Sequence, residues 1–266
     1  CSIQRRYQKL VEVAPAPFIT ETLRGKIIES AMNLAKSVDY SNLGTFEFLV
    51  FQSTQSEYDS FVFIEGNARL QVEHTVTEEV TGVDIVQSQI KLAAGASLTE
   101  LGLDADKPTI VRGYAIQNRI NCETISDSGQ IKPSAGKITT YCPPEGPGIR
   151  TDGFAYSGYE TSRAFDSLIA KLICHSNSTS LLDAVIRSKR ALKEFEISGV
   201  ETNIEFHLKL MSHPDFLSGN VNTNFLDDHL PELISDHPSV NQNSVPDKAP
   251  KRENGLPRAN TTTKDP

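Results

Sequence analysis

The chain has 266 residues and a mass of 29.2 kDa, enough for one large domain or two smaller ones. Its 26 lysine and arginine residues are outnumbered by 34 acidic residues, and the net charge of −8 argues against a general nucleic-acid binder. No apolar run is long enough for a membrane helix, and no charged-then-apolar leader follows Cys1. We therefore expect a cytoplasmic or mitochondrial protein.

The four cysteines form no CxxC pair and no cluster with histidine at zinc-ligand spacing. A framework of disulfides is typical of shorter, secreted chains. We therefore expect the cysteines to be reduced thiols.

In chain order, the sequence predicts alternating helices and strands. Helices are expected after Thr20, from a Thr75–Glu78 capping box to Gly95, after Ser180 and over residues 202–211. Strands are expected over residues 45–51, 61–73, 110–120 and 137–141, with short strands near residues 149 and 154. This pattern indicates an α+β fold with a helix-rich first part and a more antiparallel second part.

The composition changes near residue 232. Residues 235–266 contain five of the 14 prolines and no aromatic residue. Such a segment cannot bury enough apolar surface to offset the entropy of ordering it. We expect residues 232–266 to be a disordered tail or a linker.

Within the segment FIEGNARLQVEHT, residues 63–75, polar residues alternate with apolar or small ones from residue 64 to residue 73. As a strand, it would place five polar side chains on one face: Glu65, Asn67, Arg69, Gln71 and Glu73. Most alternations of this kind are ordinary strands with one solvated face. This set contains no Thr, Ser or Lys, and small residues lie between its members, so we favour a functional face.

The chemistry of this face divides into two parts. Glu65 and Asn67 offer the hard oxygen ligands that magnesium prefers, and Glu47 on the preceding strand is a plausible third donor. Arg69 presents a planar fork suited to a carboxylate, a phosphate or bicarbonate. Glu73, further along, could take a proton from a bound substrate. The arrangement predicts metal-assisted phosphoryl or acyl-phosphate chemistry.

A basic cluster lies at the start of the chain. Arg5, Arg6 and Lys9 place three cations within five residues, with Gln4 beside them. Such clusters are more often ordinary surface charge than a site. This one is functional only if it converges on the pocket of the acidic residues.

Further motifs follow in a fixed order along the chain: CSIQRRYQKLVEVAPAP, GTFEFLV, FIEGNARLQVEHTVTEEVTGVDIVQSQIKLAAG, RGYAIQNRINCET, GKITTY, GPGIR, FDSLIAKLI and GVETNIEF. In this order they resemble the C-terminal half of the biotin carboxylase component of biotin-dependent carboxylases, of the acyl-CoA or pyruvate carboxylase type. The resemblance implies the C-terminal part of an ATP-grasp domain over residues 1–110. A biotin carboxylase C-terminal domain, mostly antiparallel, would then occupy residues 111–231.

Enzymes of this family make carboxyphosphate from ATP and bicarbonate and then carboxylate N1 of biotin on a carrier domain. The resemblance implies a set of ligands for Mg²⁺ or Mn²⁺ that bridges the ATP phosphates: Glu47, Glu65 and Asn67. It also implies a set that binds bicarbonate: Lys9, Arg69, Gln71 and the backbone of Val72.

The resemblance assigns single roles to a few other residues. Glu73 would be the base that deprotonates bicarbonate, and Arg119 would stabilise the enolate of biotin. Gln4 would lie near the ATP ribose and phosphates. Arg150 resembles a dimer-contact position, and we assign it no catalytic role.

Three positions depart from the family pattern, with Tyr7 and Tyr114 in place of histidines and Gly66 in place of a methionine. The family's N-terminal half, with its glycine-rich phosphate lid, has no counterpart in these residues. The partners implied are that half, the biotin carboxyl carrier domain, a carboxyltransferase and a second copy in a homodimer, with no nucleic acid and no membrane.

Two other readings remain open on the sequence. One is a non-catalytic dimerisation or interaction module derived from a carboxylase. The other is a different ATP-grasp ligase, such as carbamoyl-phosphate synthase, which the QVEHTVTE and RIN segments fit poorly.

Overall fold

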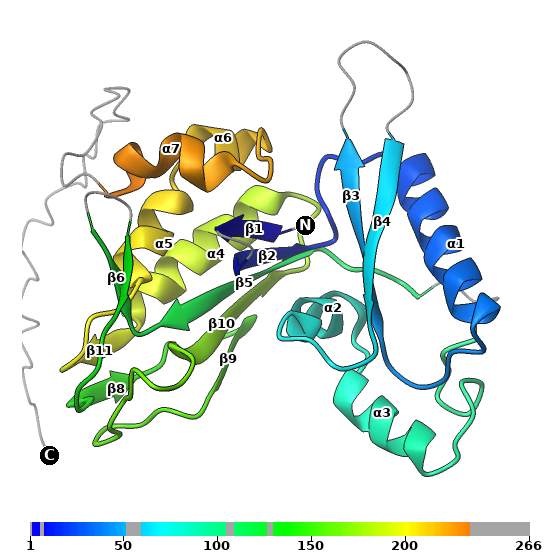
Figure 1. The fold of residues 1–266 in the computed structure, drawn as a ribbon, viewed down its shortest axis with the longest axis horizontal. Helices are drawn as coiled ribbons and strands as arrows, with labels where there is room; N and C mark the ends of the chain where they lie inside the picture. The colour runs from blue at the N-terminus through cyan, green and yellow to red at the C-terminus, as the bar shows by residue number, and fades with distance from the viewer. Residues whose placement is uncertain (1, 6–7, 52–59, 105–108, 127–129, 235–266) are drawn as a thin grey trace, which may run out of the picture. The chain divides into compact units, whose positions relative to one another are not determined.

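A computed structural model describes residues 2–5, 8–51, 60–104, 109–126 and 130–234 (Figure 1). Its elements are, in order, β1 (Ser2–Arg5), β2 (Gln8–Ala14), α1 (Glu21–Ser37), β3 (Thr45–Phe51), β4 (Ser60–Asn67), α2 (His74–Thr81), α3 (Ile85–Ala93), β5 (Tyr114–Asn121), β6 (Glu123–Ile125), β7 (Ile131–Pro133), β8 (Thr140–Cys142), β9 (Ile149–Gly153), β10 (Leu168–Ser176), α4 (Leu181–Glu194), β11 (Glu196–Ser198), α5 (Ile204–Leu210), α6 (Pro214–Ser218) and α7 (Phe225–Ile234). The α+β class expected from the sequence is confirmed.

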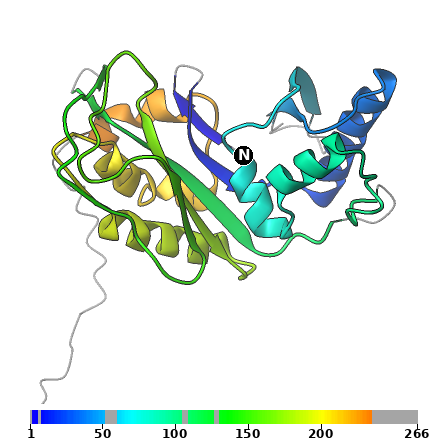
Figure 2. The same cartoon turned by 90° about the horizontal axis from the view of Figure 1, so that it is seen from below.

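A five-stranded antiparallel sheet forms the centre of the fold, with the strand order β1-β2-β5-β10-β9. Two strands from the start of the chain therefore lie beside strands that follow residue 113, as Figure 2 shows for the blue and green ribbons. Val11 faces Asn118 across the β2–β5 pair, and Glu12 faces Gln117. This pairing joins the first residues of the chain to the later part in one sheet.

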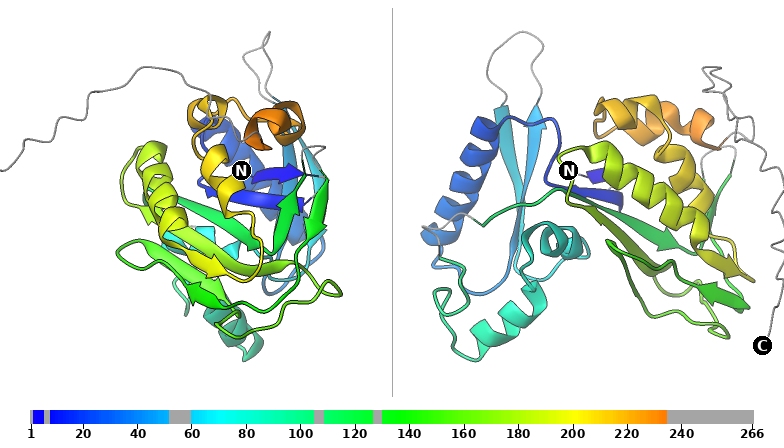
Figure 3. Two further views of the ribbon diagram at one scale, coloured as in Figure 1. Left: turned by 90° about the vertical axis from the view of Figure 1, so that its left-hand side faces the viewer. Right: turned by 180° about the vertical axis from the view of Figure 1, so that it is seen from behind.

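The two faces of this sheet pack against different helices. Ile116 and Leu172 are fully buried in the main core, which includes residues of α4 (Figure 3). On the opposite face, Val76 and Val80 of α2 pack on Ala115 and Ile173. Because side chains alternate along a strand, the α2 face also carries the odd-numbered polar residues of β5.

The β3–β4 hairpin forms a separate two-stranded sheet. Phe48 packs edge-on against Phe61 and Phe63 across the two strands. The bounds of β3 are those predicted, but its residues are half-buried rather than buried. Helix α1 begins as predicted, because the Thr20 hydroxyl accepts a hydrogen bond from the Leu23 amide at 3.1 Å.

The predicted strand over residues 61–73 is wrong beyond Asn67, where β4 ends. The chain then turns, and Glu73 occupies the N-cap position of α2. Arg69, Gln71 and Glu73 therefore do not share a pleated face with Glu65 and Asn67. Any site that unites them must be built by the turn.

The single helix predicted to follow the Thr75–Glu78 capping box is also wrong. Gly82 ends α2 with a positive φ of 72°, and Asp84 caps the separate helix α3. Thr75 and Glu78 do not cap each other, because the Thr75 hydroxyl donates to Gln117 and Glu78 accepts from the Ile85 amide at 2.8 Å.

The C-terminal region holds helices that the sequence pattern did not predict. Helices α6 and α7 follow Met211, and Phe225, Leu226 and Leu233 of α7 are buried. Helix α7 includes residues 232–234 of the predicted tail; the rest of that segment lies outside the described residues. Cys122, Cys142 and Cys174 are free thiols, as expected, and no helix in the described part is long and apolar enough to cross a membrane.

Candidate functional site

Lys9 lies at the centre of the candidate site. Its Nζ is 3.0 Å from Oε1 of Glu47 and forms a second ion pair with Glu73. Lys9 comes from β2, Glu47 from β3 and Glu73 from the turn before α2. Three segments that are distant in sequence thus converge on one cation.

The two carboxylates hold Lys9 in its charged form. Burial by itself lowers the pKa of Lys9, but hydrogen bonds and charges from Glu73 and Glu47 outweigh burial and raise it above the ordinary value. Burial likewise opposes ionisation of Glu47, yet hydrogen bonds from Gln71 and Lys9 leave the pKa of Glu47 lowered. The nearby charge of Arg69 contributes to that lowering.

Glu47, Glu65 and Asn67 form a compact set of oxygen-bearing side chains. Glu47 and Glu65 are directly opposed across the β3–β4 pair. Nδ2 of Asn67 donates to Oε1 of Glu65 at 2.7 Å and to Oε1 of Glu47 at 3.3 Å. Two carboxylates and an amide that meet in this way fit a hard divalent cation such as Mg²⁺ or Mn²⁺.

Gln71 and Arg69 behave differently within the turn. Nε2 of Gln71 donates to Oε1 of Glu47 at 2.8 Å, while the buried Oε1 of Gln71 has no hydrogen-bond partner among the described residues. An orphaned acceptor beside a lysine suits a ligand that carries a hydroxyl group and negative charge. Arg69 is exposed and donates to the Leu70 carbonyl at 3.2 Å, so its fork is not fixed to the cluster by an ion pair.

Arg119 connects this cluster to the central sheet. Its Nη2 lies 3.2 Å from Oε2 of Glu73, and its Nε donates to Oε1 of Glu12 at 2.7 Å. Neighbouring Lys171 donates to the carbonyl of Val72 at 3.3 Å. The segment that carries Val72 and Glu73 is therefore held by two cations from β5 and β10.

The basic cluster at the start of the chain is divided by the structure. Gln4 is the cross-strand neighbour of Lys9, so it lies beside the site. Arg5 is buried and lies 3.8 Å from Asp227 of α7, on the other side of the sheet from Lys9 by strand alternation. Arg6, together with Tyr7, lies outside the described residues.

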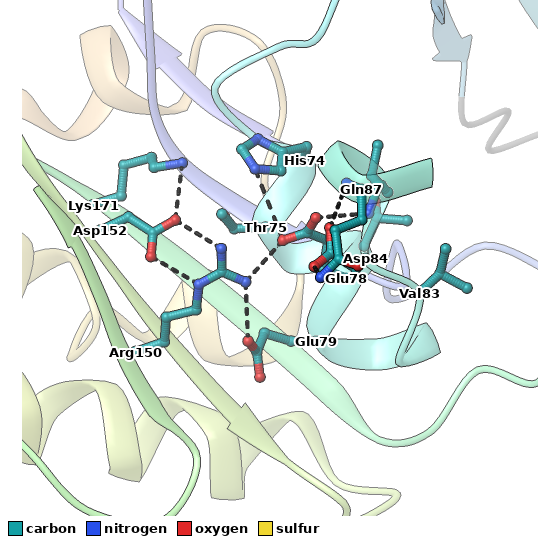
Figure 4. Close-up of polar contacts among 12 residues, drawn as sticks. His74, Thr75, Glu78, Glu79, Val83, Asp84, Gln87, Arg150, Asp152 and Lys171 are labelled. Carbon is teal, nitrogen blue, oxygen red and sulfur yellow. Dashed lines mark hydrogen bonds and ion pairs between the residues drawn. The ribbon is translucent and has the colours of Figure 1, made fainter. Parts of the chain in front are cut away.

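Arg150 belongs to a second network of charges (Figure 4). It donates to both oxygens of Asp152 at 2.8 Å and to Glu78 at 2.8 Å, and Lys171 lies 3.5 Å from Asp152. These partners raise the pKa of Arg150 and help to lower that of Asp152 despite its burial. Arg150 and Glu79 also line an open cavity of about 480 Å³ beside α2 and α3.

Sequence reasoning missed Glu12, Gln117 and Lys171, which support the site from the sheet. One signal was present, because Glu12 is a charged residue within the apolar strand sequence KLVEVA. A carboxylate buried in a strand needs a partner, which predicts a contact but does not say with which residue.

Comparison with known proteins agrees with this geometry. A family model described as Biotin carboxylase C-terminal domain matches residues 117–228, and one described as Carbamoyl-phosphate synthase L chain, ATP binding domain, matches residues 1–101. Biotin carboxylase 1 of Bacillus subtilis is 44% identical over 227 residues, which are 85% of this chain and 48% of that protein. Pyruvate carboxylase 1 of Caenorhabditis elegans is 47% identical over 244 residues, which are 91% of this chain and 20% of that protein.

Solved structures give the same result. The biotin carboxylase domain of a single-chain bacterial carboxylase matches with a TM-score of 0.79 and 42% identity, over 88% of this chain and 52% of that one. A second match is the biotin carboxylase domain dimer of the Hydrogenobacter thermophilus 2-oxoglutarate carboxylase, solved with MgADP, ADP and bicarbonate. It matches with a TM-score of 0.78 and 40% identity, over 89% of this chain and 49% of that one.

The fold is therefore that of an ATP-grasp ligase continued by a mostly antiparallel second domain. Within this class, the chain belongs to the biotin carboxylase family and represents its C-terminal half. It spans about half the length of the biotin carboxylases that it matches and about a fifth of the pyruvate carboxylases.

Proposed function

We propose that this chain supplies the metal-binding, bicarbonate-binding and biotin-facing part of a biotin carboxylase. The observation that carries the proposal is the position of Lys9 between Glu47 of the oxygen-rich hairpin and Glu73 of the turn. One cation thereby joins a metal-binding set to a general base. A reaction between a metal-bound phosphate and a small oxyanion needs these groups together.

In this proposal, three residues would hold the divalent ions: Glu47, Glu65 and Asn67. The ions, when bound, neutralise charge on the ATP phosphates. Lys9, Arg69, Gln71 and the backbone of Val72 would bind bicarbonate, and Gln4 would lie near the nucleotide. The orphaned Oε1 of Gln71 supports its place in this set.

Glu73 would accept the proton of bicarbonate, so that a bicarbonate oxygen attacks the γ-phosphorus of ATP and ADP leaves. The carboxyl group of the resulting carboxyphosphate then passes to N1 of biotin, and the phosphate that is released takes the proton that N1 loses. Arg119, 3.2 Å from Glu73, would face the negative charge that develops on the ureido oxygen of biotin. Its contact with Glu73 supports a place beside the bound bicarbonate.

The proposed partners are the N-terminal half of the enzyme, a biotin carboxyl carrier domain, a carboxyltransferase and a second copy of the enzyme. A cytoplasmic or mitochondrial location suits them. A non-catalytic interaction module is less well supported, because a chain of ion pairs links Glu47 to Lys9, Lys9 to Glu73, and Glu73 to Arg119.

The test is reconstitution. Bicarbonate-dependent ATP cleavage and the carboxylation of free biotin are measured for the chain alone and for the chain mixed with the N-terminal half of a related biotin carboxylase. We expect no turnover by the chain alone and turnover on mixing. Turnover by the chain alone, or a folded mixture that binds ATP without bicarbonate-dependent cleavage, would contradict the proposal.

A further inference from the structure

Two histidines lie together where α6 meets α7, in a part of the fold that the proposed function does not use (Figure 1). His213 occupies the N-cap position of α6, and His229 lies within α7. Their ring centroids are 4.4 Å apart. The buried ring of Phe225 packs against both, at 5.3 Å from His213 and 4.9 Å from His229. The two imidazole rings are therefore held in place by packing.

Glu232, three positions after His229 on α7, brings a carboxylate to both rings. Its Oε2 is 3.2 Å from Nε2 of His213 and 3.8 Å from Nδ1 of His229. In a tetrahedral zinc site with ligand bonds of about 2.0–2.1 Å, two ligand atoms are about 3.4 Å apart. Both distances are close to that value. One ligand atom from each of the three residues lies within 4.8 Å of the others.

Asp215 faces the remaining nitrogen of each ring. Its Oδ2 is 3.4 Å from Nε2 of His229 and 4.0 Å from Nδ1 of His213. Metal-bound histidines almost always donate their second N–H to a carboxylate, a carbonyl or water, which fixes the tautomer and the ring orientation. Asp215 is placed to accept from both. Nδ1 of His213 also accepts from the Asp215 amide at 3.2 Å, and this ring would exchange that bond for donation to the carboxylate when Nε2 binds a metal.

Nδ1 of His229 gives a second, independent indication of a ligand. It is buried and has no hydrogen-bond partner among the described residues. Because Nε2 of the same ring faces the Asp215 carboxylate, the proton belongs on Nε2 and Nδ1 keeps its lone pair. That lone pair lies 3.8 Å from the Glu232 carboxylate. A cation that both atoms can bind would satisfy the orphaned nitrogen.

We propose that His213, His229 and Glu232 form a binding site for a divalent transition-metal ion, of which Zn²⁺ fits the ligand set best, and that Asp215 orients the two histidines. Two imidazoles and one carboxylate, with a fourth position for water, are a known zinc ligand set, whereas Mg²⁺ prefers oxygen ligands alone. The bound ion joins α6 to α7. The site shares no residue with the oxygen-rich hairpin and is independent of the proposed function.

The test is a titration of the full 266-residue chain with Zn²⁺ in buffer that contains excess Mg²⁺, which occupies oxygen-only sites. Calorimetry should show one equivalent of Zn²⁺ bound. The Tm should rise by about 5 °C or more at a free Zn²⁺ concentration about a hundred times the Kd. Co²⁺ in place of Zn²⁺ should give the visible absorption of a tetrahedral ion, without the charge-transfer band that a thiolate ligand adds.

Substitutions assign the ligands. His229→Gln and Glu232→Gln each remove one ligand and should weaken Zn²⁺ binding more than about a hundredfold. Asp215→Asn keeps all three ligands and should weaken binding about ten- to a hundredfold, the range for a supporting partner. The matched controls are His175→Gln on β10 and Glu194→Gln on α4, which should leave the Kd and the Co²⁺ spectrum unchanged.

Glu232 keeps the test decisive if His229→Gln does not fold. Its side chain is 67% exposed, so Glu232→Gln should fold as the unsubstituted chain does. An unchanged Kd for Zn²⁺ in folded Glu232→Gln would show that the ion binds elsewhere and would overturn the inference. A chain that takes up no Zn²⁺, or a Co²⁺ spectrum with a thiolate band, would overturn it as well.

Discussion

Arg119 and Glu73 are 46 positions apart in the sequence and form an ion pair, with Nη2 of Arg119 3.2 Å from Oε2 of Glu73. The residue proposed to face biotin thus touches the residue proposed to deprotonate bicarbonate. Lys9 contacts the other oxygen of Glu73. Glu73 is thus paired with a cation on each of two sides, and an entering anion would have to share these cations with it.

The first prediction concerns Glu73. Glu73→Gln keeps the shape and hydrogen-bonding reach but cannot accept a proton at neutral pH. We expect carboxylation by the reconstituted protein to fall at least about 10²-fold, the lower end of what a general base contributes, while nucleotide binding changes little. Both are measured on one preparation, by turnover and by calorimetric titration with ATP analogues. Loss of nucleotide binding would show that Glu73 is not the base.

The second prediction concerns Lys9. Lys9→Met removes the cation between Glu47 and Glu73, so the affinity for an anion should fall and the KM for bicarbonate should rise about tenfold or more, the loss expected for one hydrogen bond to a charged group. The matched control is Lys91→Met, since Lys91 is exposed on α3. An unchanged KM for bicarbonate in Lys9→Met would remove Lys9 from the site.

The third prediction is a pH dependence of stability. His207 is fully buried beneath β5, where its Nε2 lies 2.8 Å from the Arg119 carbonyl, and burial lowers its pKa to about 4 from 6.5. Because its folded-state pKa is depressed, the stability it contributes is present above pH 6.5 and is lost as the pH falls through about 4. We expect a loss of about 3 kcal/mol over this window.

Urea unfolding at several pH values between 7 and 4 tests this prediction. His207→Gln should be less stable at pH 7 but should lack the loss assigned to His207 on acidification. His175→Gln is the control, because the hydrogen bond between His175 and the Arg112 carbonyl is exposed to solvent, and this substitution should leave the wild-type slope intact. A His207→Gln variant with the full wild-type slope would contradict the assignment.

The fourth prediction concerns the network of Figure 4. Asp152→Asn removes a two-pronged ion pair with Arg150 and a contact with Lys171. Because Arg150 and Asp152 are each about one-third exposed, we expect a loss of only about 1–2 kcal/mol at pH 7. The pKa of Asp152 is lowered, so this difference should vanish as the pH falls below 3.8. The exposed control Asp39→Asn should change stability by much less at either pH. A difference that persists in acid would exclude the ion pair as its cause.

The fifth prediction concerns Gly113, which leads into β5. Its φ is +63°, and a Cβ there would lie 1.8 Å from the carbonyl oxygen of Ser176. Gly102 has a similar φ of +68° but open space around it. Thermal unfolding should therefore show a loss of about 1–2 kcal/mol for Gly102→Ala, from backbone strain alone, and a clearly larger loss for Gly113→Ala. Equal losses of stability in the two variants would mean that the backbone near Ser176 shifts without cost to make room for the new Cβ.

Local patterns predicted the local structure well. The bounds of β3 and the cap at Thr20 follow from short-range chemistry, and both are confirmed. The strand over residues 61–73 is wrong because alternation continues beyond Asn67 into a turn, where side-chain direction is no longer set by the pleat. The alternation of polar and apolar residues alone could not distinguish a strand from this turn.

The sequence predicted which residues belong to the candidate site, but not how the fold brings them together. Glu47, Glu65 and Asn67 are grouped by the β3–β4 pairing, which the hairpin pattern indicated. The convergence of Lys9 on Glu73 depends instead on the pairing of β2 with β5, a contact between segments over 100 positions apart (Glu12 and Gln117 differ by 105). No spacing within either segment encodes it, and the roles of the individual residues stay predictions.

The membership of β1 and β2 in the five-stranded sheet has a consequence for anyone who would divide this protein at the boundary between its two family matches. A piece that begins after residue 110 would lack the neighbour of β5, leaving an open row of backbone donors and acceptors that can recruit strands from other molecules. It would also strip Arg119 of its buried counter-charge. The two regions matched by the family models are thus not independent folding units. A fragment that contains the later strands should also include residues 2–14.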